Sequence, residues 1–203
     1  MTYTLPKVIG FHGLAGSGKD TGADFFRTRF EGYYTKVSLA DPLKWMVTEL
    51  LAAHGHHCPW DDRDWKETPL LYGKSPRQLL QTLGTEWGRD TVSPTVWVDS
   101  MIHRVEHTLG GVVIPDIRFE NEAAAVRRLG GVVVKVTRHT GGRDPVWASH
   151  SSEGGLPGHA YDIRVDNPEG DVISYLHDLL RAVSEFTSLS LRVGREIHTT
   201  DLD

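Results

Sequence analysis

The chain has 203 residues, of which 39% are hydrophobic and 24% charged, and its formal net charge is −5. The length suits one globular domain with inserted segments. The acidic balance argues against a general binder of nucleic-acid polymers, which takes most of its non-specific affinity from basic side chains. No stretch approaches the roughly 20 apolar residues of a membrane span.

Cysteine content and the first residues bear on the compartment. Cys58 is the only cysteine, so an internal disulfide is excluded, which fits a reducing environment. The opening Met-Thr-Tyr-Thr-Leu-Pro-Lys has no signal-peptide pattern. We therefore expect a cytoplasmic protein (the host cytoplasm for a phage-encoded chain) without a membrane partner.

Short apolar strands alternate with helices in the first part of the chain. Residues 7–12 read as a buried strand, a helix is predicted from Lys19, and residues 35–39 read as a second strand. In the next helix Asp41 is the expected cap and Pro42 the first residue.

The middle of the chain is less regular. Residues 54–74 are polar and rich in turn-forming residues, which indicates a loop or mobile flap on the acceptor side of the molecule. Ser75 and Pro76 then open a helix, and a further helix is predicted over residues 95–109.

One pattern occurs twice in the second half. Residues 109–118 and 129–138 each read Leu-Gly-Gly, then an apolar strand, then an arginine at its far end. A helical stripe separates the two copies, so their strands must be parallel. A last strand is predicted at residues 161–165, before the final helix.

These elements predict an α/β fold, a three-layer parallel sheet with helices on both faces. We expect one domain over residues 1–190, with residues 54–74 and a lid-like segment at residues 139–160 as mobile parts. A polar C-terminal tail is expected over residues 191–203. Ligands of such sheets bind at the carboxyl ends of the strands, where the loop at residues 13–21, Arg118 and Arg138 are expected to meet.

Residues 13–21 read Gly-Leu-Ala-Gly-Ser-Gly-Lys-Asp-Thr, close to the phosphate-binding pattern G-x-x-x-x-G-K-[ST]. Glycines permit a tight turn whose amides surround an anion, and the helix that follows adds its positive end. Lys19 is expected to reach the β- and γ-phosphates. The predicted nucleotide-binding residues are Gly13, Ala15, Gly16, Ser17, Gly18, Lys19, Asp20 and Thr21.

Asp20 stands where the general pattern has a hydroxyl residue. Its carboxylate could hold Mg²⁺ directly or through water, and the hydroxyl of Thr21 follows one position later. Alternatively, Asp20 is a first-turn acid that favours the helix dipole. Both residues are kept as candidate metal ligands.

With these residues assembled, the chain resembles the bacteriophage deoxynucleoside monophosphate kinases of the P-loop nucleoside monophosphate kinase superfamily. The resemblance spans roughly residues 8–180. It rests on five segments: Gly-Ser-Gly-Lys-Asp-Thr (16–21), Leu-Ala-Asp-Pro-Leu-Lys (39–44), Ser-Pro-Arg-Gln-Leu-Leu-Gln-Thr-Leu-Gly-Thr-Glu-Trp-Gly-Arg (75–89), Asp-Ile-Arg-Phe-Glu-Asn-Glu (116–122) and His-Ser-Ser-Glu (150–153).

The resemblance implies a P-loop NTPase fold that uses ATP and Mg²⁺ to convert deoxynucleoside 5′-monophosphates to diphosphates. Lys-Asp-Thr is usual in this family, so Asp20 departs from the general P-loop motif but not from the family pattern. The implied partners are small nucleotides, with no nucleic-acid polymer, and a homodimer is implied.

Site residues follow from the same resemblance. Arg118 is expected to grip the acceptor phosphate, and Asp116 either holds the waters of Mg²⁺ or caps the following helix. Arg77 and Gln81 either line the acceptor or lie on a solvated helix face, and Trp87 either stacks on a base or packs in the core. The full acceptor-side set is Asp41, Lys44, Arg77, Gln81, Trp87, Arg89, Asp116, Arg118, His150 and Glu153.

Phosphoryl transfer needs positioning and charge neutralisation more than covalent chemistry. Lys19, Arg118, Arg138 and Arg143 are the predicted catalytic cations, the last two at the lid, although Arg143 could equally be an ordinary surface charge. Asn167, after the last strand, lies where related kinases hold the adenine.

Several alternatives remain at this point. Another P-loop kinase, of the phosphomevalonate or dephospho-coenzyme A type, would share the donor half. A nucleotide-controlled switch is a second alternative, although no Asn-Lys-x-Asp guanine signature is present. A helicase or DNA-packaging ATPase is disfavoured by the small, acidic chain. The histidines at residues 54–57 beside Cys58 read as a polar flap rather than a zinc site.

Overall fold

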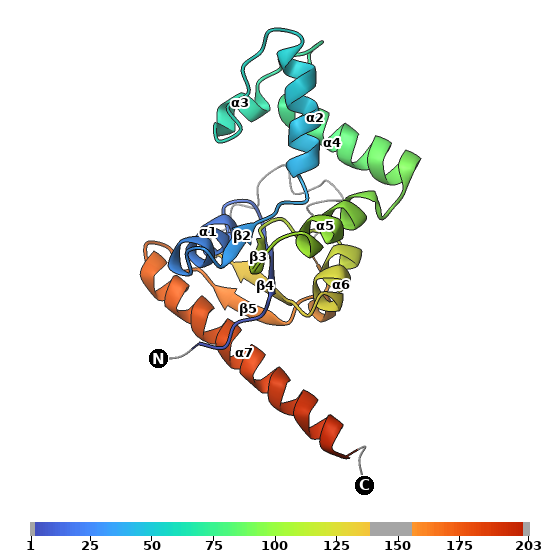
Figure 1. Cartoon of the computed structure of the whole chain (residues 1–203). Coiled ribbons are helices and arrows are strands. Elements are labelled where there is room, and N and C mark those ends of the chain that lie inside the picture. The colour runs from blue at the N-terminus through green and yellow to red at the C-terminus, as the bar shows by residue number, and fades with distance from the viewer. Residues whose placement is uncertain (1–2, 139–155, 201–203) are drawn as a thin grey trace. The chain divides into compact units, whose positions relative to one another are not determined.

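The computed structural model describes residues 3–138 and 156–200, and of residues 192–200 it describes the helical backbone alone. The chain forms two compact units. The first comprises residues 1–37 and 104–203, and the second comprises residues 38–103. Figure 1 shows the elements of each unit.

The first unit is built on a five-stranded sheet. Its strands are β1 (Val8–His12), β2 (Tyr34–Lys36), β3 (Gly111–Ile114), β4 (Val132–Thr137) and β5 (Ile163–Asp166). Their order is β2-β3-β1-β4-β5, and every neighbouring pair is parallel. The predicted parallel α/β sheet is confirmed, and β1 lies at its centre.

Helices pack on the sheet because its central strands, β1 and β3, are buried along their whole length and β4 is buried along most of its length. α1 (Lys19–Arg29) and α7 (Val172–Thr200) share one buried cluster with the sheet, which includes Phe11, Phe26 and Leu179. α6 (Glu120–Arg128) contacts β1 and β4. Burying each such large apolar side chain contributes about 1.5–3 kcal/mol. A short 3-10 turn, η3 (Gly158–Ala160), precedes β5.

The second unit is helical. It contains α2 (Asp41–Ala52), α3 (Arg63–Glu67), α4 (Pro76–Gln81), the π-helix η1 (Thr82–Val92) and most of α5 (Val96–Glu106), which leads back into the first unit. α4 begins where the Ser-Pro opening predicted a helix, and Ser75 and Gln78 form a capping box at its start. No helix in the described ranges has the length and apolar character to cross a membrane.

Residues 54–74 differ from the predicted loop or flap because they include α3. Asp62 caps this helix, and its carboxylate accepts hydrogen bonds from the amides of Asp64 (2.9 Å) and Trp65 (3.0 Å). The indole of Trp60 donates to the hydroxyl of Thr48 on α2 (2.8 Å). The segment is therefore fastened to α2 inside the second unit.

Two helix ends also differ from the predictions. Ala40 rather than Asp41 occupies the cap position of α2, because Asp41 is already the first residue of the helix. The Asp41 carboxylate instead accepts a hydrogen bond from the amide of Ser38 (2.8 Å). α7 continues as a helix to Thr200, where a polar tail was expected from residue 191.

Candidate functional site

The carboxyl ends of the parallel strands meet at one edge of the sheet. The glycine loop leaves the central strand β1, and its neighbours β3 and β4 lead into Arg118 and Arg138. The chain runs from β1 outward to β2, and later to β4 on the other side of β1. This is the topological switch point at which open α/β sheets bind ligands.

The loop after β1 has a backbone that few residues other than glycine adopt. Gly16 and Gly18 have φ angles of +79° and +102°, in the left-handed region. Gly18 is the cap of α1 and has no side chain to bond the first-turn amides. An α-helix leaves its first four amides without intrahelical partners, so this end of α1 is suited to an anion.

The lysine of the loop lies over its own backbone. Lys19 Nζ donates to the carbonyl of Leu14 (3.2 Å), and the amide of Ser17 bonds the same carbonyl (3.1 Å). The ammonium charge therefore remains beside the loop, within reach of a phosphate bound there.

A further cation, Lys36, was missed by the sequence analysis. It ends β2, and its Nζ lies 3.5 Å from Asp20 and 3.4 Å from Asp24. Asp20, the predicted metal ligand, is exposed and forms this ion pair with Lys36. The predicted strand ran over residues 35–39, so Lys36 was not expected at a strand end, whereas β2 ends at this residue.

Arg118 and Asp116 follow β3. The buried carboxylate of Glu122, 2% exposed, accepts from the amides of Arg118 (2.6 Å) and Phe119 (3.0 Å). Glu122 thus fixes the backbone that carries Arg118. Phe119, not Asp116, occupies the cap position of α6, so the capping alternative for Asp116 is wrong.

Replacing Glu122 by Ala should lower the free energy of unfolding by about 2–3 kcal/mol, because buried hydrogen bonds to a charged acceptor are worth about 1.5–3 kcal/mol. Urea unfolding measures this difference. Glu120→Ala is the matched control, since Glu120 is an exposed glutamate on the same helix whose ion pair with His159 is also exposed. Equal losses in the two variants would show that Glu122 does not hold the turn.

His12, the last residue of β1, is a second residue that the sequence analysis passed over. Its Nδ1 lies 2.9 Å from the carbonyl of Ile117, and its Nε2 accepts from the amide of Leu156 (3.1 Å). This pattern requires a neutral ring with its proton on Nδ1. Burial, and then the positive charges of Lys135, Lys19 and Arg118, lower the pKa of His12, although the bond to Ile117 opposes them.

A lowered pKa in the folded state makes stability depend on pH. Below about pH 6.5 the unfolded chain binds the proton more readily than the folded protein, so stability is present above that pH and is lost as pH falls. His12→Asn keeps a donor near Ile117 but does not titrate. Urea unfolding at pH 7.5 and 5.5 should show a larger loss in the natural protein than in His12→Asn; equal losses would contradict the burial of a neutral ring.

Arg138 reaches the glycine loop from β4. Its guanidinium Nη1 lies 3.5 Å from the carbonyl of Gly16, and its Nε is buried without a hydrogen-bond partner among the described residues. The other predicted lid residues, Arg143, His150 and Glu153, lie outside the described residues.

The remaining acceptor-side residues all belong to the second unit. Asp41 and Lys44 lie in the first turn of α2, and Arg77 and Gln81 lie one turn apart on α4. Arg77 pairs with Glu67 of α3. These cations and amides therefore come from two neighbouring helices of one unit.

Trp87 and Arg89 lie on the π-helix η1, a rare form that often marks functional sites. Trp87 is 44% exposed and its ring centroid is 6.3 Å from that of Trp97. An exposed face leaves it able to stack on a base. Arg89 donates to the carbonyl of Pro94 (3.4 Å).

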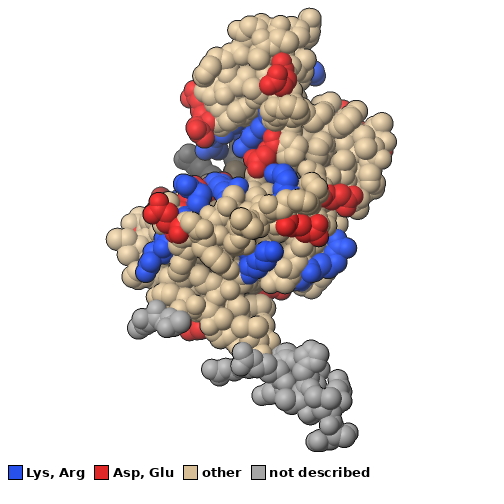
Figure 2. Space-filling view, viewed as in Figure 1, with Lys and Arg blue, Asp and Glu red and all other residues tan. Residues whose placement is uncertain are grey.

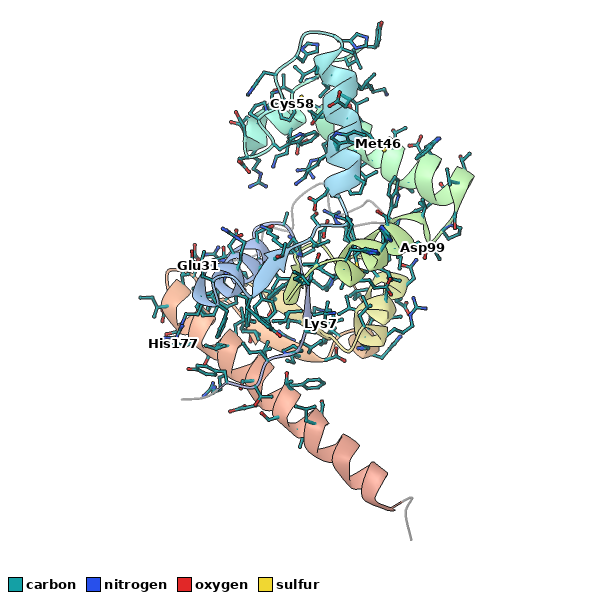
Figure 3. All side chains as sticks on the ribbon, viewed as in Figure 1. Lys7, Glu31, Met46, Cys58, Asp99 and His177 are labelled. Carbon is teal, nitrogen blue, oxygen red and sulfur yellow. The ribbon has the colours of Figure 1, made fainter. Side chains whose placement is uncertain are left out.

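The described residues contain no cluster of three or more His, Cys, Asp or Glu side chains that could hold a metal ion. Cys58, labelled in Figure 3, contacts the carbonyl of His56, and His54 packs against Tyr72. The zinc alternative therefore has no support in the described part of the chain.

On the face shown in Figure 2, basic and acidic side chains are interspersed.

Two solved structures, both of kinases, are similar to this chain along most of its length. A gluconokinase from Sinorhizobium meliloti 1021 is 15% identical, with a TM-score of 0.44 over 97% of this chain and 98% of its own. A shikimate kinase from Bacteroides thetaiotaomicron is 14% identical, with a TM-score of 0.45 over 90% of this chain and 99% of its own.

Sequence comparisons are more specific. The family model for deoxynucleotide monophosphate kinase matches residues 73–178. A putative deoxynucleotide monophosphate kinase of Acanthamoeba polyphaga mimivirus is 34% identical over an alignment of 147 residues, and the match covers 64% of this chain and 74% of that protein. The chain therefore belongs to the deoxynucleotide monophosphate kinase family.

Proposed function

We propose that this protein transfers the γ-phosphoryl group of ATP to a deoxynucleoside 5′-monophosphate, giving ADP and the deoxynucleoside diphosphate. One observation carries the proposal beyond family membership. The glycine loop lies at the carboxyl end of the central strand, and its two neighbouring strands lead into arginines at the same edge.

On the donor side, the loop amides and the first turn of α1 bind the ATP phosphates, and Lys19 neutralises charge on the β- and γ-phosphates. The exposed oxygens of Asp20 and Thr21 at this turn, and the half-buried Asp116 at the neighbouring strand end, suit Mg²⁺, which keeps several waters and few protein ligands. When bound, Mg²⁺ would supply further neutralisation of phosphate charge.

On the acceptor side, Arg118 holds the monophosphate. An oxygen of that phosphate attacks the γ-phosphorus, the bond from the γ-phosphorus to its bridging oxygen breaks, and ADP leaves. The side chains position both phosphates and no enzyme nucleophile is needed. Arg138 and Arg143 are proposed to stabilise the transferring group, whereas Asp41, Lys44, Arg77, Gln81, Trp87, Arg89, His150 and Glu153 are proposed acceptor contacts.

A coupled ADP-release assay over dAMP, dGMP, dCMP, dTMP, the ribonucleotides, phosphomevalonate and dephospho-coenzyme A tests this proposal. We expect at least one deoxynucleotide to raise the rate of ADP release well above the rate without acceptor. A response confined to phosphomevalonate or dephospho-coenzyme A would replace the proposed acceptor. ADP release independent of every acceptor would reject the kinase.

A further inference from the structure

Two buried side chains donate hydrogen bonds to backbone carbonyls of the glycine loop. Asn167, which follows β5, donates from Nδ2 to the carbonyl of Ser17 (2.8 Å). The hydroxyl of Tyr175, on α7, donates to the carbonyl of Gly18 (3.0 Å). Asn167 is 4% exposed and Tyr175 is fully buried, so neither belongs to the solvated surface.

We propose that Asn167 and Tyr175 are positioning residues of the phosphate loop, which aim the amides of Gly18 and Lys19 at the bound phosphates. This inference rests on the proposed function, because it assigns their effect to ATP binding.

The physical reason is the geometry of the peptide bond. In a trans peptide the carbonyl of one residue and the amide of the next point in opposite directions, and no cis peptide occurs in the described chain. A donor that holds the Ser17 carbonyl on one side therefore turns the Gly18 amide to the other. Tyr175 does the same for the Gly18 carbonyl and the Lys19 amide.

Two glycines leave the space that these two bonds occupy. A Cβ on Gly18 would overlap Nδ2 of Asn167, and a Cβ on Gly22 would lie 2.6 Å from the Tyr175 hydroxyl. The Gly18 carbonyl also accepts the first hydrogen bond of α1, from the amide of Gly22 (2.9 Å). Both positions therefore need glycine for the side chains to reach the loop.

The backbone of each donor is bonded: the amide of Tyr175 donates to the carbonyl of Asp171 (3.3 Å) at the start of α7. The backbone amide of Asn167 bonds the carbonyl of Thr137 at the end of β4 (2.7 Å), next to Arg138. Burial raises the pKa of the Tyr175 phenol, which keeps its proton available to donate. A fixed donor orients the loop before ATP arrives, and preorganised amides bind developing charge more strongly than mobile ones.

Tyr34 offers a matched control for Tyr175. It is also a buried tyrosine of the first unit, 4% exposed, and its hydroxyl donates to a backbone carbonyl, that of Pro6 (2.6 Å). Pro6 precedes β1 and so lies at the opposite end of that strand from the loop. Tyr34→Phe and Tyr175→Phe each remove one buried hydroxyl and differ in which carbonyl loses its donor.

The test measures the dissociation constants of ATP and of inorganic tripolyphosphate by calorimetry, below the melting temperature of every variant. Tyr175→Phe should weaken both ligands by about fivefold, the size expected for one hydrogen bond. Tyr34→Phe should leave both within about twofold. Asn167→Ala, a second variant, should weaken both ligands by a similar factor.

The outcomes separate this inference from the proposed function. Suppose that the natural protein binds ATP and that Tyr175→Phe has the same dissociation constants for both ligands as Tyr34→Phe. The positioning role of Tyr175 is then wrong. Unchanged dissociation constants in Asn167→Ala would likewise refute the positioning role of Asn167. Weaker ATP binding with unchanged tripolyphosphate binding would also overturn it, because the effect would then lie on the nucleoside. If the natural protein binds neither ligand, the proposed function itself fails.

Discussion

Lys19→Ala is expected to lower kcat for deoxynucleotide phosphorylation by about a thousandfold. The ammonium group lies at the loop, 3.2 Å from the carbonyl of Leu14. From there it can stabilise the negative charge that develops on the leaving ADP during transfer. Loss of one preorganised donor to developing charge costs about 10²–10³ in rate, and a full positive charge lies at the upper end of this range. Acceptor-dependent ADP release measures the effect.

Lys7→Ala is the matched control for this variant. Lys7, labelled in Figure 3, is exposed and precedes β1, whereas Lys19 follows the loop at the other end of that strand. The control removes the same charge from the same unit and should keep kcat within about twofold. If both variants retain activity, the loop is not the donor site.

Arg118→Ala should raise KM for the acceptor by about 30-fold or more and leave the dissociation constant of ATP within about threefold. A charge-assisted bond to phosphate contributes about 1.5–3 kcal/mol, which corresponds to about 10–150-fold. Arg118 follows β3, and Glu122 accepts a hydrogen bond from its backbone amide. The side chain of Arg118 therefore extends from a turn with a fixed backbone. Steady-state kinetics with varied acceptor and calorimetry with ATP separate the two effects.

Arg128→Ala controls for the loss of charge. Arg128 is exposed in the last turn of α6, whereas Arg118 precedes its first turn. Its removal should leave both constants within about twofold. An equal loss of acceptor and ATP affinity in Arg118→Ala would refute the division between donor and acceptor roles.

The sheet could be predicted because its sequence signals are local. Apolar strands such as residues 132–137 alternate with helices, and parallel pairing follows from that alternation. The strand order could not be predicted, since it depends on which strands pair across long stretches of chain. The helix α3 was missed because its cap, Asp62, stands among aromatic and turn residues that resemble a loop.

The candidate site was predicted in part for the same reason. The glycine loop is a contiguous motif, and Arg118 and Arg138 stand at predicted strand ends. Asn167 was expected near the adenine, but it and Tyr175 bond the loop from 150 and 157 residues away, so no local pattern predicted these bonds. His12 likewise bonds Ile117 and Leu156, and these partners appear only once the chain is folded.

The fate of the γ-phosphate is the most direct measurement of the central claim, that this edge of the sheet joins two nucleotides for phosphoryl transfer. The protein is incubated with ATP radiolabelled at the γ-position, with and without the best deoxynucleoside monophosphate, and the products are separated. We predict that the label appears in the deoxynucleoside diphosphate. Label released as inorganic phosphate at the same rate with and without acceptor would contradict the account.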